Sequence, residues 1–187
     1  TIAYHKNEVK KANTYFSSVV IANVCLLLIT IICEFLFIYK LQVFIRIPKE
    51  LIFDVKVLFA LDITNYMMLA LANTFTVSAF IKNKLDSVEV INLITYVTQV
   101  IVLVILYSFF PMRIYYVGIG LVASTVTLFA LNIRLCKKYT PDLKVRTEMF
   151  SWSAVKKLIV SGVWNSINSV GNLLNSGLDL WMSNLML

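Results

Sequence analysis

The chain has 187 residues, of which 59% are hydrophobic and 14% are charged, and its formal net charge is +7. A soluble globular domain usually carries about 25% charged residues, so this composition argues against a soluble domain and predicts a membrane protein. The basic residues lie between long apolar runs and form no basic stripe with interleaved aromatic residues, which argues against a nucleic-acid surface. The pattern is typical of contact with anionic membrane lipids.

Five apolar segments follow one another along the chain. Each is long enough to cross the hydrocarbon core of a bilayer, which takes about 20 residues. Backbone polar groups inside lipid must be satisfied within their own segment, so we expect all five segments to be helices. The predicted fold is therefore an all-α, polytopic transmembrane helical bundle. The segments are approximately residues 15–39, 51–80, 88–110, 114–133 and 153–187.

Polar and acidic side chains interrupt the first three apolar segments. Glu34 lies near the end of the first segment, and Gln99 lies in the third. Asp62 and Asn65 lie in the second segment. Because polar and charged groups inside a membrane span usually face protein or a water-filled cavity, we expect Asp62, Asn65 and Gln99 to line a hydrophilic lumen. The two acids, Glu34 and Asp62, are also candidates for ion coupling. For each residue the alternative is a polar contact that packs one helix against another.

The fourth segment carries two glycines, Gly118 and Gly120, in the sequence GIG. No predicted strand precedes them and no third glycine follows, so the pattern does not indicate a nucleotide-binding loop. Small residues in membrane helices allow neighbouring helices to approach closely, and we expect that role here.

A polar linker at about residues 136–152, with Pro141 as a helix breaker, separates the first four segments from the fifth. The linker also bears on the topology. Three stretches that fall on the same side of the membrane hold 12 of the 17 basic residues: the N-terminal flank, the loop at 82–84, and residues 134–157. By the positive-inside rule, this side faces the cytoplasm.

The fifth segment carries a regular series of polar residues. They recur at intervals of three or four residues, which places them on one line along a helix, and they are Asn165, Asn168, Asn172, Asn175 and Asp179. Such a line suits the wall of a wet cavity, in which Asp179 is a further candidate for ion coupling. Each amide offers two donors and one acceptor oxygen, which suits the hydroxyl groups of a sugar. The alternative is a set of hydrogen bonds between helices.

The residue types offer little for catalysis or metal binding. The three cysteines form no CxxC pair, and the single histidine, His5, lies outside the apolar segments. No Ser-His-Asp set and no pair of carboxylates at catalytic spacing is visible in the sequence. We therefore expect no metal, no cofactor and no enzymatic activity, and a conduit or carrier is favoured.

Three stretches of the chain resemble one family of membrane proteins. They are KNEVKKANTYFSSVV at residues 6–20, IPKELIFDVK at residues 47–56, and KKLIVSGVWNSINSVGNLLNSGLDL at residues 156–180. They look like the bacterial polysaccharide flippase family, the O-antigen and capsular repeat-unit branch of the multidrug/oligosaccharidyl-lipid/polysaccharide exporter superfamily. The resemblance spans nearly the whole chain, and its most specific part is the block from Trp164 to Asp179.

The resemblance implies a larger protein, in which two lobes with about 12 to 14 transmembrane helices in total surround a central cavity. Residues 1–135 would form part of the first lobe, residues 136–152 a cytoplasmic linker between the lobes, and residues 153–187 the first helix of the second lobe. We therefore expect the sequence to be an internal piece of a multi-pass protein of the cell inner (plasma) membrane.

The resemblance also implies a function. Such proteins flip oligosaccharide repeat units linked to polyprenyl pyrophosphate from the cytoplasmic to the outer leaflet, by alternating access, for surface polysaccharide biosynthesis. The implied partners are the lipid-linked oligosaccharide, membrane lipids and the polysaccharide polymerase machinery, and not nucleic acid. The alternatives are a cation-coupled multidrug or organic-cation exporter of the same superfamily, a polytopic glycan-modifying membrane enzyme, and a structural membrane scaffold.

Overall fold

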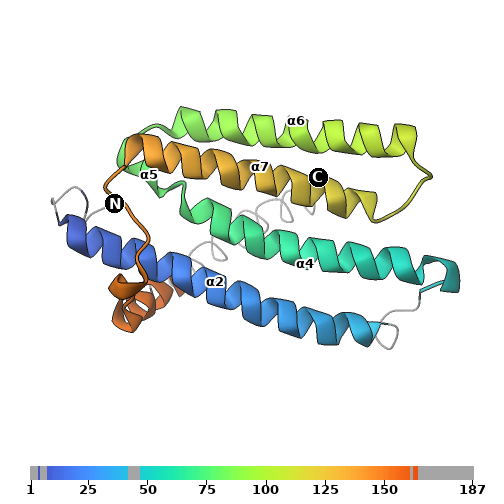
Figure 1. Ribbon diagram of the computed structural model, residues 1–187, viewed down its shortest axis with the longest axis horizontal. Coiled ribbons are helices and arrows are strands. Elements are labelled where there is room, and N and C mark those ends of the chain that lie inside the picture. The colour runs from blue at the N-terminus through green and yellow to red at the C-terminus, as the bar shows by residue number, and fades with distance from the viewer. Residues whose placement is uncertain (1–3, 5–7, 42–46, 161, 164–187) are drawn as a thin grey trace, which may run out of the picture. The chain divides into compact units, whose positions relative to one another are not determined.

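The computed structural model of the chain describes residue 4 and residues 8–41, 47–160 and 162–163 (Figure 1). Its contacts divide the chain into two compact units, Thr1–Phe150 and Ser151–Leu187. In the second unit, residues 152–160 and 162–163 are helical. The elements of the first unit are α2 (Val9–Tyr39), η1 (Lys49–Leu51), α4 (Ile52–Thr74), α5 (Val77–Ile81), α6 (Leu85–Phe109), α7 (Tyr116–Tyr139) and η2 (Thr147–Met149).

Helical stretches long and apolar enough to cross a membrane make up most of the first unit. They are Val9–Tyr39, Lys49–Ile81, Leu85–Phe109 and Tyr116–Tyr139. The part of the chain that the structure describes contains no β-strand. The prediction of an all-α, polytopic transmembrane bundle is therefore confirmed. The fifth predicted span falls mostly on residues outside the described ranges.

The four long helices of the first unit form a row in the order α2, α4, α7, α6 (Figure 1). Helix α4 packs against α2 on one side and against α7 on the other, and α7 also packs against α6. Neighbours in space are therefore not always neighbours in sequence, and α4 and α7 lie side by side while running in the same direction (Figure 1). Helix α7 is an inner member of this row and contributes the largest share of its buried side chains.

Two glycines allow α7 to fit between its neighbours. A Cβ atom placed on Gly118 would lie 2.8 Å from Cβ of Leu61 on α4, which is closer than real Cβ contacts. A Cβ atom on Gly120 would lie 3.0 Å from Cγ of Leu103 on α6. The two glycines thus face different helices, and the prediction that they serve close helix packing is confirmed.

The second predicted segment is not one continuous helix, and the expectation of a single helix over residues 51–80 was wrong in this respect. Helix α4 ends at Thr74 and α5 begins at Val77. Between them the backbone N–H of Phe75 donates to the carbonyl of Ala72, and that of Thr76 donates to the carbonyl of Asn73. These bonds join residues three positions apart, whereas those of an α-helix join residues four apart. The hydroxyls of Thr74 and Thr76 also donate to backbone carbonyls, and such bonds compete with regular helix geometry.

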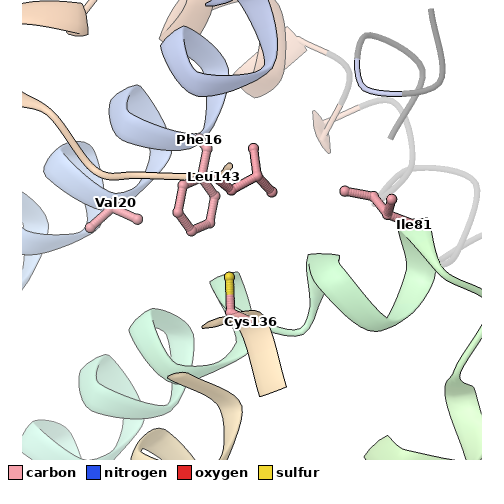
Figure 2. Packing of buried hydrophobic residues seen from close by; sticks show 5 residues of the cluster. All are labelled: Phe16, Val20, Ile81, Cys136 and Leu143. Atoms are coloured by element: carbon pink, nitrogen blue, oxygen red, sulfur yellow. The ribbon is translucent and has the colours of Figure 1, made fainter. Parts of the chain in front are cut away.

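A hydrophobic cluster lies near the start of α2 and joins α2, α5, α7 and the segment that follows α7 (Figure 2). Its buried members are Phe16, Val20, Ile81, Cys136 and Leu143. In Figure 2 the side chains of Phe16 and Leu143 lie next to each other, with the thiol of Cys136 pointing toward them. Because Leu143 belongs to the predicted polar linker, part of that linker contributes to the core of the first unit.

Candidate functional site: a polar face on a membrane-spanning helix

One side of α4 carries exposed polar residues in the middle of a membrane span. Asp62, Tyr66 and Asn73 are all exposed, and Tyr66 retains 67% of its accessible surface. Their spacings of four and seven residues place them on the same side of the helix. We call these three residues the α4 polar face. These residues are exposed because α2 and α7 cover other sides of α4, and within the described part of the chain no helix covers this side.

The exposed surfaces of α2 and α6 have a different character. The exposed side chains in the middle of α2 include Leu28, Ile29 and Ile32, which are suited to lipid. Those in the middle of α6 include Val97 and Ile101. An Asp at the centre of a lipid-facing helix costs about 2.5–3.5 kcal/mol on insertion scales. The polar side chains of α4 therefore mark a surface that is unlike these two lipid-suited surfaces.

The other two residues expected to line a lumen lie elsewhere. Asn65 is partly buried, and its Oδ1 atom is inaccessible and has no hydrogen-bond partner among the described residues. Gln99 is also partly buried, and its Cγ atom would lie 3.6 Å from a Cβ atom on Gly120, at the contact between α6 and α7. Since α7 stands between α4 and α6, the structure does not bring Gln99 together with Asp62.

Glu34 is buried, although the other residues in the second half of α2 are almost all exposed. Only 8% of its surface is accessible. The hydroxyl of Thr64 on α4 donates a hydrogen bond to Glu34 Oε2 over 3.4 Å. No lysine or arginine in the described ranges forms an ion pair with this carboxyl. Glu34 therefore sits at the contact between α2 and α4, away from the α4 polar face.

Amide side chains reach the break between α4 and α5 from both neighbouring helices. Asn23 on α2 donates to the hydroxyl of Thr74 over 2.9 Å, and Asn132 on α7 donates to the carbonyl of Ala72 over 3.2 Å. Asn132 is fully buried, and its Oδ1 atom has no partner among the described residues. The sequence analysis did not select Asn132, although an amide within an apolar span was a visible signal.

The series of polar residues in the fifth predicted segment lies outside the described residues. The structure therefore places none of its members, and their position in a lumen stays a prediction. They are Asn165, Asn168, Asn172, Asn175 and Asp179. Within the described ranges, no group of three or more His, Cys, Asp or Glu side chains gathers in a way that could hold a metal ion.

Comparison with known proteins supports the conclusion that the chain belongs to a membrane protein. No family model matches the chain, and no solved structure matches it. The chain is 27% identical over 190 residues to the uncharacterized membrane protein EpsK of Bacillus subtilis (strain 168). The alignment covers 100% of this chain and 37% of that protein, so the chain spans well under half the length of this relative. The candidate spans and this similarity together define a multi-span membrane protein.

Proposed function

We propose that the chain is part of a transporter that flips lipid-linked oligosaccharide units from the cytoplasmic to the outer leaflet of the plasma membrane. The observation that carries this proposal is the α4 polar face, with Asp62, Tyr66 and Asn73 exposed within a candidate membrane span. The sequence resemblance to polysaccharide flippases and the similarity of the whole chain to part of a membrane protein support the same proposal.

The chemistry of the α4 polar face suits a sugar. A carboxylate, a phenol and an amide offer both donors and acceptors, and a sugar presents many hydroxyl groups that can take either role. A hydroxyl that moves from water to such a face exchanges one hydrogen bond for another, with a net change of about 0.5–1.5 kcal/mol. A path of this kind can therefore hold an oligosaccharide loosely enough to release it.

In the proposed mechanism, the oligosaccharide passes along a wet path between two lobes while the polyprenyl tail stays in the bilayer. The lobes rock against each other and open the path first to one side and then to the other. Asp62 accepts hydrogen bonds from sugar hydroxyls, and the amides of the fifth segment extend the path on the second lobe. The chain performs no covalent chemistry in this cycle.

Ion coupling is assigned to the acids of the spans: Asp62 on the open side of α4, Glu34 between α2 and α4, and Asp179 in the fifth segment. Acidic residues inside membrane spans are typical of proton and cation relays in transporters. The polysaccharide polymerase machinery is the proposed protein partner, because it would consume the flipped repeat units.

A cation exporter of the same superfamily is the second candidate function. Asp62 favours it, because an exposed carboxylate without an ion pair among the described residues also attracts an organic cation. A pyrophosphate group, by contrast, favours cationic partners, and the middle of the described spans supplies none.

The two candidates can be separated with the complete protein. Deletion of its gene should abolish a surface polysaccharide and leave the lipid-linked repeat unit on the cytoplasmic side, and the complete gene should restore export. In reconstituted vesicles, the protein should move a fluorescent lipid-linked oligosaccharide between leaflets. Movement of a fluorescent organic cation, with the oligosaccharide left in place, would favour the exporter instead.

Substitutions of Asp62 test the proposed oligosaccharide path. Asp62→Leu should strongly reduce export per folded molecule, and Asp62→Asn should retain part of it because the amide still accepts a hydrogen bond. Glu89→Leu is the matched control, since Glu89 is an exposed carboxylate on α6, away from the α4 polar face. Normal export by Asp62→Leu would contradict the proposed path.

A further inference from the structure

The start of α2 holds the segment after α7 by side-chain hydrogen bonds to its backbone. Asn13 donates to the carbonyl of Asp142 over 3.1 Å and accepts from the backbone N–H of Lys144 over 3.0 Å. Ser17, one turn further along α2, donates to the carbonyl of Lys144 over 3.3 Å and accepts from the N–H of Arg146 over 3.0 Å. We call these four hydrogen bonds the linker clamp.

In the linker clamp, side chains of a helix bind the backbone of an extended segment. The backbone groups that α2 engages belong to residues 142, 144 and 146, and alternation of this kind is the period of an extended chain. Asn13 and Ser17 are four residues apart, which places them on one side of α2. Both side chains are buried, with Ser17 at 0% exposure, so water does not compete strongly for these bonds.

Hydrophobic packing reinforces the linker clamp from within. Leu143 lies between the clamped backbone groups and packs in the cluster that contains Phe16 and Cys136 (Figure 2). The path from α7 to this point is also fixed, because Thr140 donates to the carbonyl of Cys136 and accepts from the N–H of Leu143 at its own carbonyl. The segment is therefore joined to α2 or α7 through residues 140, 142, 143, 144 and 146.

We propose that Asn13 and Ser17 are positioning residues that make α2 and residues 140–146 move as one body. Because η2 also contacts α2 and the first unit extends to Phe150, any bending between the two units of the chain then begins after η2, and not across the whole polar linker at residues 136–152. The link to transport rests on the proposed function, in which two lobes rock against each other. The linker clamp itself does not depend on what is transported.

Hydrogen exchange at two backbone amides tests the linker clamp directly in the complete protein. Asn13→Leu should speed exchange at the Lys144 amide about fivefold, and Ser17→Ala should do the same at the Arg146 amide, because each loses the acceptor for that N–H. Thr14→Ala is the matched control, since within the described ranges the Thr14 hydroxyl bonds only to the carbonyl of Lys10. Unchanged exchange in both clamp variants would overturn the proposal.

A conservative variant covers the case in which Asn13→Leu does not fold. Asn13→Asp keeps an oxygen that accepts from the Lys144 N–H but loses the donor to the carbonyl of Asp142. The Lys144 amide should therefore remain protected in this variant. Exchange there as fast as in an unstructured peptide, in the wild type as well as in this variant, would show that Asn13 does not hold the segment.

A covalent tether tests whether the linker clamp stays closed during transport. Asn13→Cys and Lys144→Cys are combined in a protein whose other cysteines are replaced, and the pair is oxidised to a disulfide. If the two elements move as one body, export by the oxidised protein equals export by the reduced protein. Loss of export on oxidation, with recovery on reduction, would overturn the proposal. If no variant exports the oligosaccharide, the proposed function fails while the exchange measurement still decides the linker clamp.

Discussion

A buried carboxylate, Asp54, joins two elements at the end of the bundle opposite the start of α2. It stands in the first turn of α4 and is only 2% exposed. Its Oδ1 atom accepts from Arg113 over 3.4 Å, and its Oδ2 atom accepts from the backbone N–H of Ile114 over 3.4 Å. Because Arg113 and Ile114 precede α7, this carboxylate joins the start of α4 to the loop that leads into α7.

Removal of this carboxylate should lower the stability of the protein. We expect Asp54→Ala to reduce the free energy of unfolding by about 1–2 kcal/mol, since the Arg113 side chain is 51% exposed and water screens the pair. Thermal unfolding of the complete protein in detergent measures the effect. Lys56→Ala, which removes a nearby positive charge without a described ion pair, is the control. Equal stability of Asp54→Ala and the control would show that the contact is not stabilising.

Glu34→Gln separates a packing role from an ion-coupling role. The amide keeps an oxygen that accepts the hydrogen bond from Thr64, but it cannot bind and release a proton. We therefore expect a folded yield and melting temperature close to the wild type, together with reduced export. Thr64→Val is the comparison variant, because it removes the hydrogen bond and leaves the carboxyl in place. Normal export by Glu34→Gln would identify this residue as a packing contact only.

At the scale of the helices, the GIG sequence of α7 supports a prediction about packing. Gly118→Val should destabilise the protein by about 1–3 kcal/mol, because the added atoms meet the Cβ atom of Leu61 on α4. Gly120→Ala should cost less, since its nearest neighbours are the more movable outer atoms of Leu103.

Gly162 supplies the control for this pair of variants. A Cβ atom on Gly162 would meet no atom of the described residues within 4 Å, so Gly162→Ala should leave the melting temperature equal or slightly higher. The three variants are compared by thermal unfolding in the same detergent. A Gly118→Val protein as stable as Gly162→Ala would contradict the close approach of α4 and α7.

The helices could be predicted from the sequence because a lipid environment leaves an apolar segment few other structures. Long apolar runs thus predicted the four described spans, and the pair of glycines predicted close helix packing. The break after Thr74 was not predicted, since it depends on hydroxyls that bond to particular carbonyls and on amides from two other helices. That Asp62 is exposed while Gln99 is partly buried could not be predicted from the sequence, because the difference depends on the order of helices in the row.

At the scale of the whole first unit, the described parts of three basic stretches that belong to this unit meet at one end. The Nζ atom of Lys82 lies 5.7 Å from the centre of the Tyr4 ring, which joins the loop after α5 to the region before α2. The bonds from Asn13 to residues 142 and 144 bring the segment after α7 to the same end. This grouping agrees with the topology predicted from the charges, and the assignment of that end to the cytoplasm stays a prediction.

Thiol labelling in intact cells tests this assignment. Single cysteines replace Lys49 and Lys84 in a protein without other cysteines, and an impermeant reagent is added from outside. We expect Lys49→Cys to react and Lys84→Cys to react only after the cells are opened, because the positive-inside rule places the lysine-rich end in the cytoplasm. Labelling of Lys84→Cys alone in intact cells would show that the topology is the opposite of the predicted one.

The order of the helices in the row has a consequence for how the protein is made. Helix α6 leaves the ribosome before α7, yet α7 is its main packing partner and separates it from α4. While α6 enters the bilayer, it therefore has lipid on the side that α7 later covers, and its strongly apolar surface suits this interval. Helix α7 then has to insert between two helices already in the membrane, and its glycine-lined sides reduce the width of the gap that it needs.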